Sequence, residues 1–306
     1  MLRCSLTEPG GESKVGTSFH VGLRIPAMYP PALRTLDIVA LLSEAPYGMP
    51  LSTIATTLAL PKSAAHRLLA GLCDRGYARQ LPENHHYALT FKLAALGFRQ
   101  LAATRVDEVC QPVLDRLAAS SGELARLAVV EGERMTWVAK AQGTLSGLRY
   151  DAHTGREVVL HATAVGKIWL ASLPEDRVLA IIGSVGIGNV EGLGPRALRT
   201  LGELREQLRE SRRRGYGVAV EEGEPGVAAV AAAVRASSAA DAPVVATISV
   251  AGPVGRMDES RREALGREVV GGAEELSEIW PVRVRHRQAE GREDGIEQRE
   301  DLANVR

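Results

Sequence analysis

Four side chains near the start of one amphipathic segment could contact the phosphates and base edges of DNA. They are Lys62, Ser63, His66 and Arg67. Read as a helix, the segment Leu58–Gln80 places them opposite an apolar stripe that repeats at i, i+3, i+4 and i+7. The stripe consists of Ala65, Leu68, Leu69 and Leu72. A short helix with one apolar face and one small, basic face can enter a major groove, which is about 12 Å wide.

The neighbouring patterns would hold this helix in place. Helical patterns over Leu33–Glu44 and Leu51–Ala59 precede it, and Pro61 is placed to begin the third helix. Two short strand-like runs follow at 77–81 and 86–90, joined by a turn. Three helices and a hairpin predict a winged helix-turn-helix. The hairpin residues expected to reach the DNA backbone or minor groove are Arg79, His85 and His86.

The same pattern also fits a small helical domain whose amphipathic helices only pack a core. Charge favours DNA, because residues 30–100 hold seven Lys or Arg against four Asp or Glu in a chain of zero net charge. Lys62 and Arg67 lie in the first two turns, where backbone N–H groups and the helix dipole also attract phosphate. The surplus of three is modest, so a sensor or adaptor whose first domain binds protein stays an alternative.

Composition excludes several classes of protein. The 306 residues are enough for two domains, and with 45% hydrophobic but only 4% aromatic residues the cores must be built from Ala, Val, Leu and Ile. No apolar run approaches the roughly 20 residues that span a bilayer, and the first residues lack a secretory signal. Three widely spaced cysteines are not a disulfide framework. We therefore expect a cytoplasmic protein without a membrane span.

Beyond the first domain, helical and alternating patterns predict an α+β domain. A helical region covers 91–119, and Pro112 is expected to interrupt it or to begin a second helix. Strand patterns occur at 124–132, 133–142, 146–152, 215–222, 226–236 and 243–252. Helical patterns occur at 163–173, 175–183, 196–215 and about 259–279. The sequence therefore predicts about six mostly antiparallel strands, with helices inserted midway and one at the end.

One predicted helix start in this domain could bind an anion. Thr163 can cap the helix that follows, which turns the N–H groups of Ala164, Val165 and Gly166 outward at the positive end of the helix dipole. Such an end readily receives a carboxylate. An ordinary capped helix, with Gly166 present for close packing, explains the same residues. Lys167 is then expected to face solvent.

Four segments carry a family resemblance. Residues 160–171 read LHATAVGKIWLA, residues 214–217 and 221–227 read RGYG and EEGEPGV, residues 248–253 read ISVAGP, and residues 61–69 read PKSAAHRLL. In unbroken order over about residues 32–280, they resemble the IclR family of bacterial transcription regulators. The resemblance implies a winged-helix head, a linker helix and a GAF-like domain that binds a small-molecule effector, in a dimer or a dimer of dimers.

The resemblance also implies which strand residues face this helix start and line the effector pocket. They are Ala219, Ala229, Ser249 and Ala251, which join Thr163, Ala164, Val165 and Gly166 as the expected effector-binding residues. This chain departs from the family pattern, because alanine stands at 219, 229 and 251 where Asp, Cys and Ser are found in members that bind small oxoacids. An apolar wall satisfies the oxygens of an oxoacid poorly. We therefore expect a larger, partly apolar effector such as an aromatic or branched acid; a degenerate pocket without a ligand is the alternative.

Enzyme motifs are missing from the sequence. It contains no Gly-x-Ser-x-Gly elbow, Walker loop, dinucleotide fingerprint or His-Glu-x-x-His. A hydrolase or transferase using His161 and Lys167 is the best enzyme alternative, but it lacks an evident nucleophile and leaves the first domain unexplained. Glu221 and Glu222 are expected at an exposed strand end rather than at a metal. We expect no cofactor and no metal.

The sequence thus predicts a non-enzymatic regulator with five segments. They are a flexible segment 1–29, a winged helix-turn-helix 30–90, a linker helix 91–104, an effector-binding domain 105–284 and a polar, disordered tail 285–306. In a dimer, two recognition helices roughly 34 Å apart would read a pseudo-palindromic double-stranded operator. Arg67 is expected to make a bidentate base contact and Lys62 to touch phosphate. The effector would bind one of two arrangements of the dimer more tightly than the other. Its binding would thereby change the placement of the two DNA-binding heads.

Overall fold

The computed structural model describes residues 31–143, 148–187 and 192–280. Two compact units make up this part of the chain, one built around residues 31–113 and the other around 114–235 and 243–275. The segments 1–29 and 285–306, for which the sequence predicts flexibility, lie outside the described residues.

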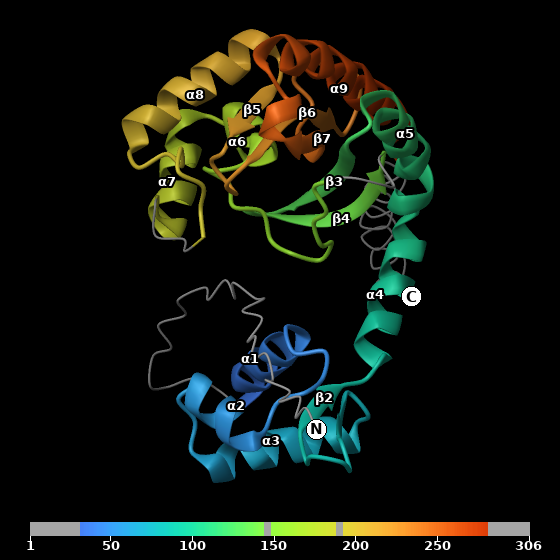
Figure 1. Cartoon of the computed structure of the whole chain (residues 1–306), viewed down its shortest axis with the longest axis vertical. Coiled ribbons are helices and arrows are strands. Elements are labelled where there is room, and N and C mark those ends of the chain that lie inside the picture. Colours follow the sequence, from blue (N-terminus) through green and yellow to red (C-terminus); the bar gives the residue numbers. More distant parts are fainter. Residues whose placement is uncertain (1–30, 144–147, 188–191, 281–306) are drawn as a thin grey trace, which may run out of the picture. The chain divides into compact units, whose positions relative to one another are not determined.

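The first unit begins as a winged helix-turn-helix, as the sequence predicts (Figure 1). Its elements are α1 Pro31–Ser43, α2 Leu51–Thr57, α3 Lys62–Asp74, β1 Ala78–Gln80 and β2 Tyr87–Leu89. The two strands pair antiparallel, and Met49 adds a single bridge to Tyr87. The hairpin is therefore tied to the residues that precede α2.

One face of α3 is held in the core of this unit. Ala65, Leu69 and Leu72 of the predicted stripe are buried. Leu69 and Leu72 pack with buried residues of α1 and α2 such as Ile38 and Ile54. Burial of each large aliphatic side chain contributes about 1.5–3 kcal/mol. The stripe thus fixes the orientation of α3 and leaves its opposite face to solvent.

Two helices follow the hairpin, α4 Lys92–Thr104 and α5 Val106–Ser121. The sequence predicts that Pro112 interrupts the helical region or begins a second helix, and both alternatives are wrong. The break occurs at Arg105, whose backbone is left-handed with φ +56°, whereas Pro112 lies inside α5. Proline costs the helix one N–H donor. Burial of Val113, Leu114 and Leu117 directly after it compensates that loss and keeps α5 continuous.

The second unit contains a five-stranded sheet in the order β4-β3-β7-β6-β5, with every neighbouring pair antiparallel. The strands are β3 Leu124–Glu131, β4 Arg134–Gln142, β5 Gly217–Val220, β6 Val227–Arg235 and β7 Val244–Pro253. The α+β class is as predicted, but the described residues of this unit hold five strands rather than about six.

The expected strand at 146–152 accounts for the difference. Residues 148–152 are not a strand, because side chains of β4 bind their carbonyl groups: Lys140 Nζ donates to Ala152 O, and Gln142 Nε2 donates to Tyr150 O, both at 3.0 Å. Backbone pairing with the edge of β4 comes later, where Val158 N donates to Met135 O. The segment therefore reaches the sheet edge beyond the predicted strand.

Helices α6 Ala164–Ala171, α7 Glu175–Val185 and α8 Leu201–Arg214 are inserted between β4 and β5, and α9 Glu259–Ile279 follows β7. A capping box between Thr200 and Glu203 starts α8, later than the helical pattern at 196 predicts. None of the helices that the structure describes is both long and apolar enough to cross a membrane.

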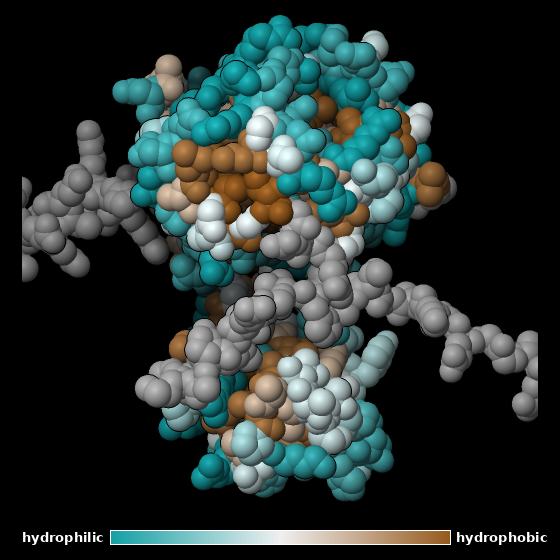
Figure 2. Space-filling model, turned by 90° about the vertical axis from the view of Figure 1, so that its left-hand side faces the viewer, coloured by the Kyte–Doolittle hydropathy of each residue, from teal (hydrophilic) through white to brown (hydrophobic). Residues whose placement is uncertain are grey.

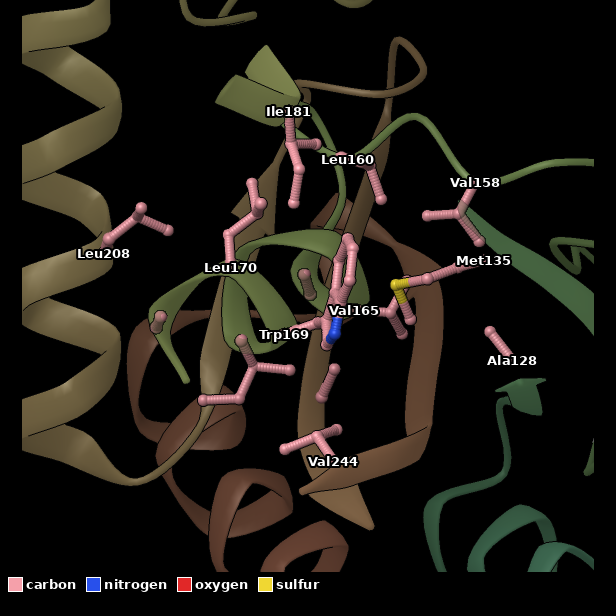
Figure 3. Packing of buried hydrophobic residues seen from close by; sticks show 14 of the residues in the cluster. Ala128, Met135, Val158, Leu160, Val165, Trp169, Leu170, Ile181, Leu208 and Val244 are labelled. Carbon is pink, nitrogen blue, oxygen red and sulfur yellow. The ribbon is translucent and has the colours of Figure 1, made fainter. Parts of the chain in front are cut away.

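Helix α6 lies directly on one face of the sheet, and α5 and α9 lie on the other (Figure 1). Gly217 of β5 permits this contact, and Gly166 of α6 lets the residues just before the helix lie close against it. A Cβ on Gly217 would come within 2.3 Å of Ala164 O, and a Cβ on Gly166 within 2.2 Å of Leu160 O. Figure 3 shows Trp169 of α6 in the middle of the apolar cluster, with Met135 and Val165 on one side and Leu170 on the other.

Candidate functional site

The outer face of α3 presents the four polar residues that the sequence singles out. Lys62, Ser63, His66 and Arg67 are all exposed, and they lie opposite the buried stripe. Pro61 is the N-cap and provides no side-chain cap hydrogen bond. A Cβ on Gly71, farther along the helix, would meet nothing within 4 Å. This face is therefore basic, free of bulky apolar groups and open to a large partner.

The hairpin carries the other three predicted DNA contacts. Arg79 is exposed on β1, and His85 is exposed in the turn between β1 and β2, with a left-handed backbone at φ +58°. Gln80 Nε2 donates to His85 O at 3.0 Å, and His86 N donates to Asn84 Oδ1 at 3.0 Å. These bonds hold the turn in one shape, with His86 half-buried beneath it.

In the second unit, the cap predicted at the start of α6 is present. Thr163 Oγ1 accepts a hydrogen bond from Gly166 N at 3.1 Å and donates to Val159 O at 2.9 Å. The expectation that the Gly166 N–H group points outward is therefore wrong, because the cap itself uses it. Ala164 and Val165 are buried together with the rest of the helix.

Lys167 does not face solvent, so that prediction is also wrong. Helix α6 packs against β5, β6, β7 and α8, and the Lys167 side chain is fully buried. Its Nζ lies 2.7 and 2.8 Å from the two carboxylate oxygens of Glu222, which is buried rather than at an exposed strand end. The described residues contain no group of three or more His, Cys, Asp or Glu placed to hold a metal ion.

The predicted strand residues share one face of the sheet. Ala219 pairs with Ala229, and Ala229 pairs with Ala251, so the three alanines form one cross-strand row. Ser249 lies in the next row of the same face, directly opposite Arg126 of β3. Gly217 of this face contacts α6. The structure thus brings these positions together on the side of the sheet that α6 covers.

Sequence reasoning missed two polar residues of this face, Arg126 and Thr247. Arg126 is 8% exposed, its Nε has no hydrogen-bond partner among the described residues, and burial lowers its pKa. The hydroxyl groups of Thr247 and Ser249 are also buried without partners. The available signal was an arginine in the middle of the apolar run LARLAVV. These three side chains are named the polar cluster below.

A stacked arrangement holds Arg126 in place. Its guanidinium carbon lies 3.4 Å from the centre of the Trp137 ring and 5.8 Å from that of Tyr150. A β-bulge in the pairing of β3 with β4, between Leu127 and Ala128, brings Trp137 opposite Ala128 and onto the same face as Arg126. The bulge therefore supplies the ring on which the cation rests.

An exposed basic helix in a winged helix-turn-helix and a separate α+β unit with buried polar side chains define a class: DNA-binding regulators that carry their own sensing domain. Residues 31–82 match the model of the IclR helix-turn-helix domain, and residues 98–278 match that of the bacterial transcriptional regulator IclR C-terminal domain. The chain belongs to the IclR family of bacterial transcriptional regulators.

Curated relatives and solved structures agree with this assignment. The regulator BhcR of Paracoccus denitrificans is 31% identical over 252 residues, covering 80% of this chain and 84% of the relative. XynR of Escherichia coli is 29% identical over 227 residues, covering 74% and 87%. An IclR homologue from Microbacterium hydrocarbonoxydans, solved in complex with 4-hydroxybenzoate, has the same fold with a TM-score of 0.62 at 23% identity, covering 81% and 99%.

The alternative functions lose support. The two matched domain models and these relatives are regulators with a DNA-binding domain, which favours neither an adaptor nor an enzyme. In the hydrolase or transferase alternative, Lys167 would have to act on a substrate. Its ammonium group is instead enclosed and bound to Glu222. His161 is fully buried as well, and burial lowers its pKa.

Proposed function

We propose that α3 reads a double-stranded operator through its exposed face. Ser63, His66 and Arg67 would contact base edges in the major groove, with Arg67 bidentate, and Lys62 would contact phosphate. The hairpin residues Arg79, His85 and His86 would reach the backbone or minor groove. The observation that carries this proposal is that all four α3 residues are exposed on one face while the opposite face is locked in the core.

The first test is binding of the full-length protein to labelled DNA from its own upstream region, against scrambled DNA, over a range of salt concentrations. The logarithm of the affinity should fall with the logarithm of salt by about 0.9 per neutralised phosphate. Arg67→Ala should lose about 5- to 150-fold in affinity for the specific DNA, because a bidentate base contact contributes about 1–3 kcal/mol of discrimination. Its binding to scrambled DNA should change much less.

Arg209→Ala is the matched control, because Arg209 is an exposed arginine on α8 in the other unit. It should leave the affinity for specific DNA unchanged. Near-normal specific binding by Arg67→Ala would remove Arg67 from the interface. Binding that salt barely changes would contradict the assignment of α3 and the hairpin as the DNA-reading surface.

The second unit is proposed to bind a partly apolar or aromatic acid. The start of α6, with Thr163, Ala164, Val165 and Gly166, lies on the same face of the sheet as the alanine row and Ser249. Methyl groups at Ala219, Ala229 and Ala251 favour a hydrophobic ligand body over a small oxoacid. Because the Microbacterium homologue is complexed with 4-hydroxybenzoate, this acid is a natural first compound for a binding screen.

We also propose that the protein is a cytoplasmic dimer or tetramer. Two of its DNA-binding heads would then bind one pseudo-palindromic operator. Helix α4 has no buried residue, and Phe98 on it is 70% exposed; Leu36 on α1 is exposed as well. A second copy of the chain would cover these side chains. Figure 2 also shows an apolar area on the side of the second unit that carries α7. Leu179 and Val185 of α7 are exposed.

We assign these functions to the segments that are expected from the sequence. The head spans 30–90, the linker helix 91–104 and the effector-binding domain 105–284. Sedimentation of the full chain should give a dimer or tetramer, and Phe98→Asp should shift it towards smaller species because a charge opposes burial of that face. An unchanged sedimentation coefficient for the variant would exclude Phe98 from the subunit contact.

A further inference from the structure

The polar cluster contains a buried cation whose charge is not matched by a bound carboxylate. A guanidinium taken out of water is costly unless an anion or several acceptors replace its hydration. Arg126 is 8% exposed, its Nε has no hydrogen-bond partner in the part of the chain that the structure describes, and its guanidinium rests on the ring of Trp137. A ring face attracts a buried cation. This attraction is weaker than the penalty for taking the ion out of water.

The acidic side chains around Arg126 are engaged with other partners. Glu224 is the carboxylate whose charge acts on Arg126, and its Oε1 accepts a hydrogen bond from the Tyr150 hydroxyl at 2.7 Å. Asp151 accepts from Lys140, which lies opposite Arg126 on β4. Neither carboxylate forms an ion pair with Arg126 among the described residues.

Two hydroxyl groups lie beside this cation. Ser249 is the cross-strand neighbour of Arg126, and Thr247 is one row further along the same face, opposite Ala128. Both hydroxyls are buried and have no hydrogen-bond partner among the described residues, and a buried hydroxyl without a partner destabilises the fold. One planar cation and two hydroxyls on adjacent rows match a carboxylate, because guanidinium binds it through two parallel N–H···O bonds and hydroxyls can donate to the same oxygens.

The surroundings of the polar cluster fit an apolar ligand body. On the β6 side, Ala231 is opposite Ser249 and Ala233 is opposite Thr247. Ala229 and Ala233 are only half-buried, so this part of the face is not fully covered by the protein. Methyl groups are small, and a ligand lying on them would bury hydrocarbon against hydrocarbon.

We propose that Arg126, with Ser249 and Thr247, binds the carboxylate of the effector, whose hydrocarbon body lies on the alanines of β6. This inference rests on the proposed effector binding by the second unit and makes it specific. The carboxylate is assigned to the sheet, at Arg126, rather than to the N-terminal end of α6, where Thr163 already occupies the Gly166 N–H group. Arg126 thereby selects acids over neutral compounds of the same shape.

The test compares each acid with its amide in calorimetric titrations of the full-length protein. The compounds are benzoate, 4-hydroxybenzoate, phenylacetate and isovalerate, each paired with the corresponding amide. For at least one pair, the wild type should bind the acid at least about tenfold more tightly than the amide. In Arg126→Met that acid should lose about 10–100-fold in affinity, while its amide changes by less than about threefold, since a charge-assisted bond is lost only for the acid.

The control variant is Arg134→Met, which removes an exposed arginine from β4 of the same sheet. It should keep the preference for the acid. Arg126→Lys keeps the charge without the planar fork and should give an intermediate loss. This second variant also keeps the test decisive if Arg126→Met does not fold, which circular dichroism would show.

Two outcomes would overturn the inference. One is an undiminished preference for the acid in folded Arg126→Met or Arg126→Lys. The other is a wild-type protein that binds none of these acids. Operator binding, measured separately on the same preparations, distinguishes this failure from failure of the proposed DNA-reading function, because Arg126 lies in the other unit from α3.

Discussion

Two buried cations in the second unit differ in whether a carboxylate binds them. Lys167 on α6 is fully buried, and both oxygens of the Glu222 carboxylate are within 2.8 Å of its ammonium group. Arg126 on β3 is nearly as buried, but it lies over the ring of Trp137, and its Nε has no hydrogen-bond partner among the residues described. A cation with its own carboxylate serves the fold. A cation left without one is available to a ligand, and the fold has to tolerate its desolvation.

The largest loss of stability should come from breaking the ion pair between Lys167 and Glu222. Glu222→Gln leaves the ammonium group of Lys167 buried without a counter-charge, and such a loss costs about 3–5 kcal/mol. We expect the free energy of unfolding of the variant, measured by urea denaturation, to fall by that amount. The double variant Lys167→Met, Glu222→Leu should recover most of it, because a well-packed apolar pair can replace a buried ion pair. A loss below about 1 kcal/mol in Glu222→Gln would contradict a structural role for the pair.

The comparison also shows how far the sequence could predict the molecule. Periodicity revealed the winged helix-turn-helix, because the buried stripe and the exposed basic face of α3 lie on one helix and are visible in one segment. The alanines and Ser249 of the sheet face came from family resemblance. Nothing local distinguished Lys167 as buried, since its partner Glu222 is far away in the sequence. The partnerless state of Arg126 depends on three strands, β3, β4 and β7, which only the folded sheet brings together.

Removing one hydroxyl group at a time compares a threonine that has hydrogen-bond partners with a threonine for which the described residues provide none. Thr163 Oγ1 makes two hydrogen bonds at the start of α6, whereas Thr247 Oγ1 is buried and has no partner within the described ranges. Thr163→Val should lower the free energy of unfolding by about 1 kcal/mol, the usual cost of losing a cap. Thr247→Val should raise it by up to about 1 kcal/mol, since it removes an unsatisfied group and leaves a β-branched residue in a strand.

Both variants exchange a hydroxyl for a methyl group, so thermal unfolding of the two proteins at equal concentration compares them directly. The sign of the difference is the decisive observation. If Thr247→Val were destabilised as much as Thr163→Val, its hydroxyl would already be satisfied in the folded protein. The argument that the polar cluster is open to a ligand would then lose one of its three members.

The smallest effect is expected for Arg126→Met without ligand. Loss of the contact with Trp137 would cost about 0.5–2 kcal/mol, and removal of an incompletely paired buried charge should return a similar amount. We expect the free energy of unfolding to stay within about 1 kcal/mol of the wild type, in contrast to Glu222→Gln. A loss of 3 kcal/mol or more would mean that Arg126 is as much a structural cation as Lys167. If the variant and the wild type were nearly equal in stability, the fold would not depend on this guanidinium. The guanidinium could then bind a ligand without loss of the fold.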